Sequence, residues 1–232
     1  MAKSTVTVKN VGPTKTNPAV DAAVREKIIA ARVGLLLRHS FFGNLATRLI
    51  IQNADDWLPT AATDGRHFFY NSEFVNKLSV KQLEFLFGHE ILHVCYDHMG
   101  RRGDRNAQVY NVACDYCVNQ DLVTSKVGEP ITQVPLLLDS KYDGKSSEEV
   151  YELLMQNVNK IKLDDLIKQV LDQHLDGDDD GDGDPDENGD PLNGKGKRPK
   201  YTEDERKQIQ DEFREAMLSA AQQAKGSLPA GI

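Results

Sequence analysis

Hydrophobic positions recur with helical spacing in several stretches of the chain, and residues 79–99 (SVKQLEFLFGHEILHVCYDHM) are almost wholly apolar. Ser79 and Gln82 have the spacing of a capping box, which predicts that a helix begins there. Gly100 and Gly103 are expected to mark its end. Amphipathic helices are also predicted over residues 21–37, 106–122, 146–157 and 163–175, and in a last helix that begins after Thr202.

Two short stretches have the composition of β-strands. Residues 47–52 (TRLIIQ) are a β-type run, and residues 58–70 (LPTAATDGRHFFY) have the pattern of a hairpin. Asp64-Gly65 is a favoured two-residue turn, and the aromatic residues that follow suit a strand. The pattern therefore predicts an α+β fold, mostly helical, with a small antiparallel or mixed sheet packed on the helix of residues 79–99.

The polar stretches divide the chain into four parts. Residues 1–17 are expected to be a flexible N-terminal arm, and residues 18–175 to be the folded domain. Residues 176–200 form an acidic low-complexity linker that is too polar to fold alone. Residues 201–232 carry a C-terminal helix whose apolar face must pack on the domain or on a partner.

Composition excludes several classes of protein. Residues 176–190 hold nine acids and neither Lys nor Arg, so the net charge of −8 leaves +1 on the rest, which does not suggest a nucleic-acid partner. No apolar run approaches the roughly 20 residues of a membrane span, and the N-terminus lacks the apolar stretch of a secretory signal. Three cysteines are too few for a disulfide framework, so a cytoplasmic location is expected.

An H-E-x-x-H motif lies inside the apolar stretch, at His89-Glu90-Ile91-Leu92-His93. Residues four apart lie on the same face of a helix, so His89 and His93 can offer two imidazole nitrogens to one Zn²⁺ ion. Glu90 falls on the adjoining strip, where it can take a proton from water. Burying two histidines and a glutamate without a partner is unfavourable, which favours a metal site over a structural histidine pair.

Catalytic zinc usually takes three protein ligands, so the motif needs a third. His98 is nearest in sequence, but five residues turn a continuous helix by about 140°, which points His98 away from the metal. No glycine lies between His93 and His98 to break the helix. Asp115 lies on the next predicted helix, and antiparallel pairing would bring it back to the motif. Asp115 is therefore the favoured ligand, while His98 stays open as an alternative ligand or as a residue behind the ligands that holds an acid or stabilises an oxyanion.

Cys114-x-x-Cys117 could hold a metal or act as a redox pair. Both cysteines lie within a predicted helix, however, and no second pair of this kind exists in the chain. They are better interpreted as small buried apolar residues.

The acidic stretch also fits the twelve-position loop of a Ca²⁺-binding EF-hand. The residues at the ligand positions are Asp176, Asp178, Asp180, Asp182 and Glu187. A tract so rich in Asp and Gly matches the pattern easily, and no helix follows Glu187. A flexible acidic linker is therefore the favoured interpretation, and calcium binding the alternative.

Four segments resemble a known family, in the same order and spacing: TAATDGRHFFYNSEFV, GHEILHVCYDHMGRRGDR, YNVACDYCVNQDL and LLLDSKYDGKSSEEVYELL. The family is the predicted metallopeptidase domain found beside von Willebrand factor A-like domains in bacterial and phage proteins. The resemblance covers about residues 18–155. It implies a zincin-like fold, a bacterial or phage-infected host cell as the setting, and a MoxR-type AAA+ ATPase or a von Willebrand factor A-like protein as partner.

The resemblance also implies that His89, His93 and Asp115 bind zinc and that Glu90 is the base. The expected activity is that of a zinc metalloendopeptidase whose sheet-edge strand, taken to be HFFY (residues 67–70), pairs with an extended substrate. His67, His98 and Tyr116 are candidate oxyanion donors. The alternative is a non-catalytic protein-binding module that zinc stabilises.

Overall fold

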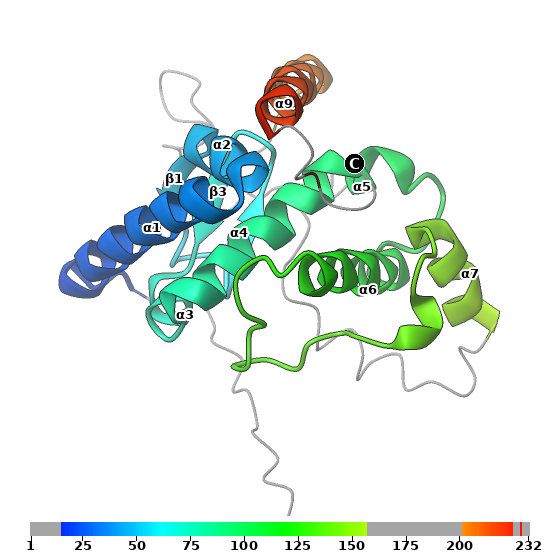
Figure 1. Cartoon of the computed structure of the whole chain (residues 1–232), viewed down its shortest axis with the longest axis horizontal. Coiled ribbons are helices and arrows are strands. Elements are labelled where there is room, and N and C mark those ends of the chain that lie inside the picture. Colours follow the sequence, from blue (N-terminus) through cyan, green and yellow to red (C-terminus); the bar gives the residue numbers. More distant parts are fainter. Residues whose placement is uncertain (1–14, 157–200, 225–227, 229–232) are drawn as a thin grey trace, which may run out of the picture.

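Helices make up most of the described chain, and a three-stranded sheet lies among them (Figure 1). The structure is a computed structural model that describes residues 15–156, 201–224 and 228. The helices of this part are α1 (Pro18–Arg38), α2 (Ser40–Arg48), α3 (Ser72–Asn76), α4 (Val80–Cys95), α5 (His98–Arg101), α6 (Ala107–Thr124), α7 (Ser147–Gln156) and α9 (Glu203–Ala224), with a 3₁₀ turn, η1 (Ser140–Tyr142). The strands are β1 (Ile50–Asn53), β2 (Ala61–Thr63) and β3 (His67–Tyr70). The predicted α+β class, mostly helical with a small mixed sheet, is confirmed.

The sheet has the strand order β1-β3-β2, so β3 is its central strand. β1 runs parallel to β3, with Ile50 beside His67, and β2 runs antiparallel to it, with Thr63 beside Phe68. The hairpin predicted over residues 58–70 is confirmed, although its connection is longer than a two-residue turn. The prediction that HFFY forms the sheet edge is wrong. All four of its residues are buried, and β1 and β2 take the hydrogen bonds on its two sides.

α4 is the helix around which the other elements pack, and α1, α2 and α6 all contact it (Figure 1). It begins as predicted: Ser79 Oγ accepts a hydrogen bond from the backbone N–H of Gln82, and the Gln82 side chain accepts one from the backbone N–H of Ser79. Its side toward the sheet is apolar, where Phe87 stacks on Phe68 of β3 with ring centroids 4.2 Å apart. The sheet is therefore packed on the helix that carries the H-E-x-x-H motif.

The end of α4 differs from the prediction. The helix stops at Cys95, well before Gly100, and the short helix α5 starts at His98. Asp97, between them, has a φ of 51°, in the left-handed region that asparagine and aspartate tolerate better than other side chains. Its carboxylate then accepts a hydrogen bond from the backbone N–H of Gly100. An aspartate thus ends one helix and caps the next without a glycine.

α2 is a helix that the hydrophobic pattern did not predict. Only the second half of the β-type run 47–52 is a strand, because Thr47 and Arg48 are the last residues of α2. The helix packs tightly on α1: a Cβ at Gly43 would lie 2.4 Å from the Cα of Leu36. A helix this short depends on tertiary packing of this kind, which the local pattern does not reveal.

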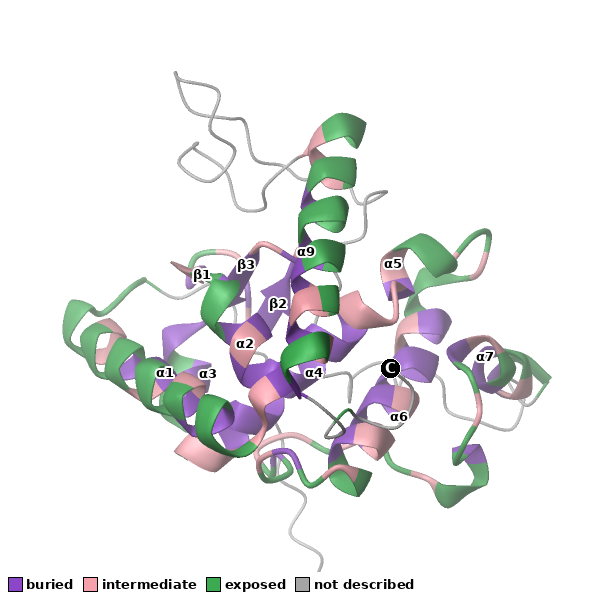
Figure 2. Cartoon of the chain, turned by 45° about the horizontal axis from the view of Figure 1, so that its top comes forward, coloured by how far each residue is buried: buried purple, intermediate pink, exposed green. Residues whose placement is uncertain are grey.

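α9 packs on α2 and on α4, with its buried face turned inward and its other faces exposed (Figure 2). A capping box starts it, since the backbone N–H of Thr202 donates to Glu205 Oε2 over 2.7 Å and Thr202 Oγ1 accepts from the Glu205 N–H over 3.2 Å. None of the helices in the described residues is both long and apolar enough to cross a membrane.

Several predictions fall outside the described residues. They are most of the arm 1–17, the helix 163–175, the acidic linker 176–200 and the calcium loop of Asp176, Asp178, Asp180, Asp182 and Glu187.

Candidate metal centre

The H-E-x-x-H histidines and Asp115 lie together where α4 packs on α6. The Nε2 atoms of His89 and His93 are 3.0 Å apart. Asp115 Oδ1 lies 3.7 Å from His89 Nε2 and 3.5 Å from His93 Nε2. All three side chains are buried, at 0%, 2% and 0% exposure. Helix pairing thus brings an acid of α6 to the two imidazoles, as the sequence predicts.

The spacing of these three atoms fits a metal ion. A tetrahedral zinc ion with bonds of about 2.0 to 2.2 Å separates its ligand atoms by about 3.3 to 3.6 Å, and the three observed separations bracket that range. The two Asp115 separations are longer than the usual 2.7 to 3.2 Å of an N–H···O hydrogen bond. Two imidazoles and one carboxylate are also the donor types that zinc binds in catalytic sites, so the residues fit the ion.

Glu90 follows His89 on α4, and its side chain has no exposed surface. A buried carboxylate in an apolar helix carries a large desolvation penalty. In an H-E-x-x-H motif, the residue at this place in the sequence is the general base.

In each of the two imidazoles, the ring nitrogen that faces away from Asp115 also has a partner. His89 Nδ1 lies 3.0 Å from Oδ1 of Asn119, and the Asn119 amide donates to the backbone carbonyl of Leu137 over 3.3 Å. Asn119 is one turn from Asp115 on α6 and is fully buried. The sequence shows Asn119 in a polar stripe with Asp115, but the stripe alone does not say that it contacts a histidine.

His98 lies behind His93. The break at Asp97 returns His98 toward α4, so its Nδ1 is 3.0 Å from His93 Nδ1, the ring nitrogen opposite the one that faces Asp115. His98 Nε2 is 2.9 Å from the hydroxyl of Ser147 at the start of α7. The assumption of an unbroken helix is therefore wrong, and His98 contacts His93 and Ser147. Ser147 is 49 residues from His98, and no local pattern links the two.

The other candidate oxyanion donors lie elsewhere. His67 faces Asp64 and Tyr201: Asp64 Oδ2 is 2.8 Å from His67 Nδ1 and accepts a hydrogen bond from the Tyr201 hydroxyl over 2.6 Å. His67 alternates on β3 with Phe68, which faces α4, so it points to the opposite face of the sheet. Tyr116 packs its ring on Tyr142, with centroids 4.6 Å apart.

Cys114 and Cys117 lie on α6 as free thiols. Burial raises the pKa of Cys114 and raises the pKa of Cys117 to about 11, so both thiols are protonated at neutral pH. A protonated thiol is a poor metal ligand and a poor nucleophile. Cys114 is buried, as the sequence predicts, whereas Cys117 is only partly buried.

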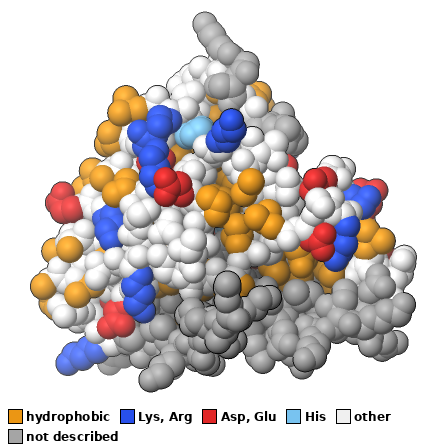
Figure 3. Space-filling model, turned by 60° about the horizontal axis from the view of Figure 1, so that its bottom comes forward, with side chains coloured by type: hydrophobic (Ala, Val, Ile, Leu, Met, Phe, Trp, Pro, Cys, Tyr) orange, Lys and Arg blue, Asp and Glu red, His pale blue; other side chains and the backbone are white. Residues whose placement is uncertain are grey.

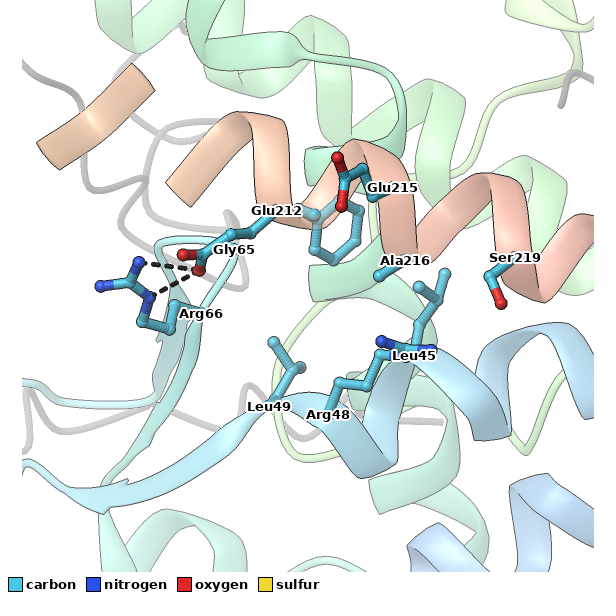
Figure 4. Close-up of a pocket in the computed structure, with 10 residues that line it drawn as sticks. Leu45, Arg48, Leu49, Gly65, Arg66, Glu212, Glu215, Ala216 and Ser219 are labelled. Carbon is cyan, nitrogen blue, oxygen red and sulfur yellow. Dashed lines mark hydrogen bonds and ion pairs between the residues drawn. The ribbon is translucent and has the colours of Figure 1, made fainter. Parts of the chain in front are cut away.

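A surface pocket of about 490 Å³ lies away from the metal group, between α2, the tip of the hairpin and α9 (Figure 4). The ion pair between Arg66 and Glu212, 2.7 Å long, lies at one end, and Leu45 and Phe213 contribute apolar surface. None of His89, His93 and Asp115, which together form the metal group, lines this pocket. On the face shown in Figure 3, charged side chains of both signs are interspersed, so that face is not a basic surface.

A model of one protein family, described as "Putative metallopeptidase domain", matches residues 23–229 of the chain. A comparison with curated proteins and a comparison with solved structures each found no significant match.

Proposed function

We propose that this chain, which belongs to the "Putative metallopeptidase domain" family, is a zinc-dependent metalloendopeptidase. The observation that carries the proposal is the buried group of His89, His93 and Asp115, whose three donor atoms lie 3.0, 3.5 and 3.7 Å from one another, close enough to share one zinc ion. Under the proposal these three residues are the ligands and Glu90 is the general base. A protein or peptide is the substrate class.

The residues of the chain divide the chemistry among them. When bound, zinc supplies Lewis acidity, which activates water and polarises the scissile carbonyl. Glu90 takes the proton from the attacking water and passes it to the leaving amine, so that the peptide bond breaks with no net change in the protonation of the enzyme. Glu90 has no exposed surface, so bulk water does not compete for that proton.

A sheet edge gives the substrate a backbone to pair with. β3 is internal, so an extended peptide has to add to β1 or β2. Of these two edge strands, β2 packs against α4, the helix of His89 and His93. The three residues of β2 are buried, however, whereas β1 is exposed or partly exposed along its length, so we assign substrate pairing to the outer edge of β1 instead of to HFFY.

The substitution Glu90→Gln tests the proposal. It should retain one zinc ion per chain and the wild-type unfolding temperature, while cleavage of an unfolded protein substrate falls to background. Glu84→Gln makes the same change at another buried position of α4, where the carboxylate pairs with Lys81 and Arg38 instead. That control should keep both zinc and cleavage. Wild-type cleavage by the Glu90 variant would refute the role of Glu90.

One further expectation rests on the family resemblance, and one competing function follows from the same ligands. The partner that the resemblance implies is a MoxR-type AAA+ ATPase or a von Willebrand factor A-like protein. The competing function is a zinc-stabilised binding module. It predicts that the wild-type chain binds zinc and gains stability from it but cleaves no substrate, with or without such a partner.

A further inference from the structure

Each histidine of the metal group has a buried partner on the ring nitrogen that faces away from Asp115. Asn119 lies against His89, and His98 lies against His93, each over 3.0 Å. Asn119 and His98 are 0% and 2% exposed, so water does not replace these contacts. The chemistry proposed above uses neither residue, and both require a physical explanation because buried polar side chains are retained only when their hydrogen bonds are satisfied.

The amide of Asn119 has one consistent orientation. Its Nδ2 faces the backbone carbonyl of Leu137, which only accepts hydrogen bonds, so Oδ1 must face His89. An amide oxygen also only accepts. His89 therefore carries its ring proton on Nδ1, and its Nε2 presents a lone pair toward His93 and Asp115.

The contact between His93 and His98 joins two Nδ1 atoms, so one of them must donate. If the Nε2–H of His98 donates to the hydroxyl of Ser147, then His98 Nδ1 is the acceptor and His93 Nδ1 is the donor. In this arrangement His93 also directs an Nε2 lone pair into the group. The Nε2 atoms of His89 and His93 are 3.0 Å apart, so without an ion one of them has to carry a proton and donate; the arrangement with two Nε2 lone pairs is that of the zinc-bound chain.

We propose that Asn119 and the His98–Ser147 pair are positioning residues that hold His89 and His93 as Nδ1-protonated tautomers. Both Nε2 lone pairs then converge with the Asp115 carboxylate on the metal position. The inference rests on the zinc site of the proposed function but not on peptide hydrolysis. It also gives α6 two roles, because Asp115 and Asn119 are four residues apart on one face of this helix. Asp115 supplies the third ligand, and Asn119 supplies the hydrogen-bond acceptor behind His89.

Matched substitutions at Asn119 isolate the hydrogen bond from the shape of the side chain. Asn119→Leu keeps the size but removes the acceptor, and Asn119→Asp keeps an acceptor for His89 Nδ1–H. Loss of an outer partner typically weakens metal binding about 10- to 100-fold, so the Leu variant should bind zinc that much more weakly while the Asp variant stays close to wild type. The zinc dissociation constant is measured by competition with a chelator on the full chain, and circular dichroism checks the fold.

A second pair of variants and a spectroscopic measurement cover the case in which an Asn119 variant fails to fold. His98→Leu should weaken zinc binding in the same range, and His98→Asn, which keeps an acceptor, should restore part of it. Nitrogen-15 NMR of the histidine side chains in the metal-free chain should show His89 as the Nδ1-protonated tautomer. In the Asn119→Leu variant it should show a mixture of tautomers.

Two results would overturn the inference. One is a folded Asn119→Leu variant with wild-type zinc affinity; the other is an equal loss of affinity in the Leu and Asp variants, which would indicate a packing role only. A wild-type chain that binds zinc with the predicted tautomer but cleaves nothing would instead remove the proposed hydrolysis and leave this inference standing.

Discussion

Two buried clusters of this chain each combine histidine with a carboxylate, and the spacing of their polar atoms differs. In the first, Asp115 lies 3.5 and 3.7 Å from two imidazole nitrogens. In the second, Asp64 accepts hydrogen bonds of 2.8 Å from His67 and 2.6 Å from Tyr201, and its other oxygen accepts from the backbone N–H groups of Arg66 and His67. The Asp64 cluster is closed by hydrogen bonds, whereas the Asp115 cluster has the separations that an ion bridges.

The comparison teaches that residue type and burial are insufficient to identify a metal site. Both clusters contain the same kinds of side chain, and both are buried. The donors around Asp64 come from a tight hairpin connection and from Tyr201, which satisfy the carboxylate locally. Around Asp115, three donor atoms come from two helices that are held apart by their own packing. The two clusters therefore differ in how far the neighbouring polar atoms lie from the buried carboxylate, and not in residue type or burial.

The two clusters should differ most in zinc binding and cleavage when one histidine is removed from each. His93→Leu should weaken zinc binding on the order of a hundredfold or more, as one ligand supplies roughly a quarter of the 10 to 16 kcal/mol of a four-ligand site. It should also abolish cleavage. His67→Leu, the matched control, should retain zinc and cleavage even if it lowers the unfolding temperature. Loss of zinc in the His67 variant, measured by metal analysis, would contradict the assignment.

Zinc itself should stabilise the fold through the first cluster only. At a free zinc concentration about 1,000 times the dissociation constant, binding to the folded state adds about 4 kcal/mol to the free energy of unfolding. Urea unfolding with zinc and with a chelator measures the difference. In the His93→Leu variant, whose zinc affinity should be at least about a hundredfold weaker, the gain should fall to about 1.4 kcal/mol or lower, whereas it should persist in the His67→Leu variant. An equal gain in both variants would mean that zinc binds elsewhere.

The features that the sequence predicts are those determined by residues close together in the chain. The capping box at Ser79, the hairpin around Asp64 and the shared face of His89 and His93 all follow from local spacing. Asp115 could be predicted because a short connection between two helices makes antiparallel packing the simplest arrangement. The apolar side of α4 follows from its composition, and Phe87 packs on the sheet as expected.

The remaining features depend on contacts between distant segments or on a local conformation with no sequence signature. The left-handed Asp97 breaks α4 where no glycine is present, and it moves His98 behind His93. The central place of β3 depends on β1, a strand parallel to it that has no turn signal. The contact of His98 with Ser147 joins α5 to α7. Sequence spacing does not predict contacts between such distant residues, because only the packing of their segments brings them together.

In the second cluster, Tyr201→Phe should remove one hydrogen bond to a buried carboxylate. Such bonds contribute about 1.5 to 3 kcal/mol, and the partial exposure of Tyr201 places the expected loss at the lower end, about 1.5 kcal/mol. Urea unfolding of the full chain measures it. Zinc affinity should not change, since Tyr201 is not part of the metal group. A change in zinc affinity would show that the two clusters are coupled.

The smallest effect is the dependence of this second cluster on pH. Burial opposes ionisation of Asp64, but the hydrogen bonds from His67 and Tyr201 outweigh it and hold the pKa of Asp64 below its ordinary value of 3.8. A lowered pKa in the folded state stabilises the fold fully above 3.8, and the contribution is lost as the pH falls through the lower folded value. The wild type should therefore be more stable than the Asp64→Asn variant at pH 7 and pH 5 by the same margin. That margin should shrink below pH 3.8, because the amide in the variant does not titrate whereas the wild-type carboxylate becomes protonated.

Urea unfolding of both proteins at pH 7, 5 and 3 measures the margin. A constant margin across all three would mean that the Asp64 cluster stabilises the chain through packing alone and that the closed hydrogen bonds around its carboxylate contribute nothing.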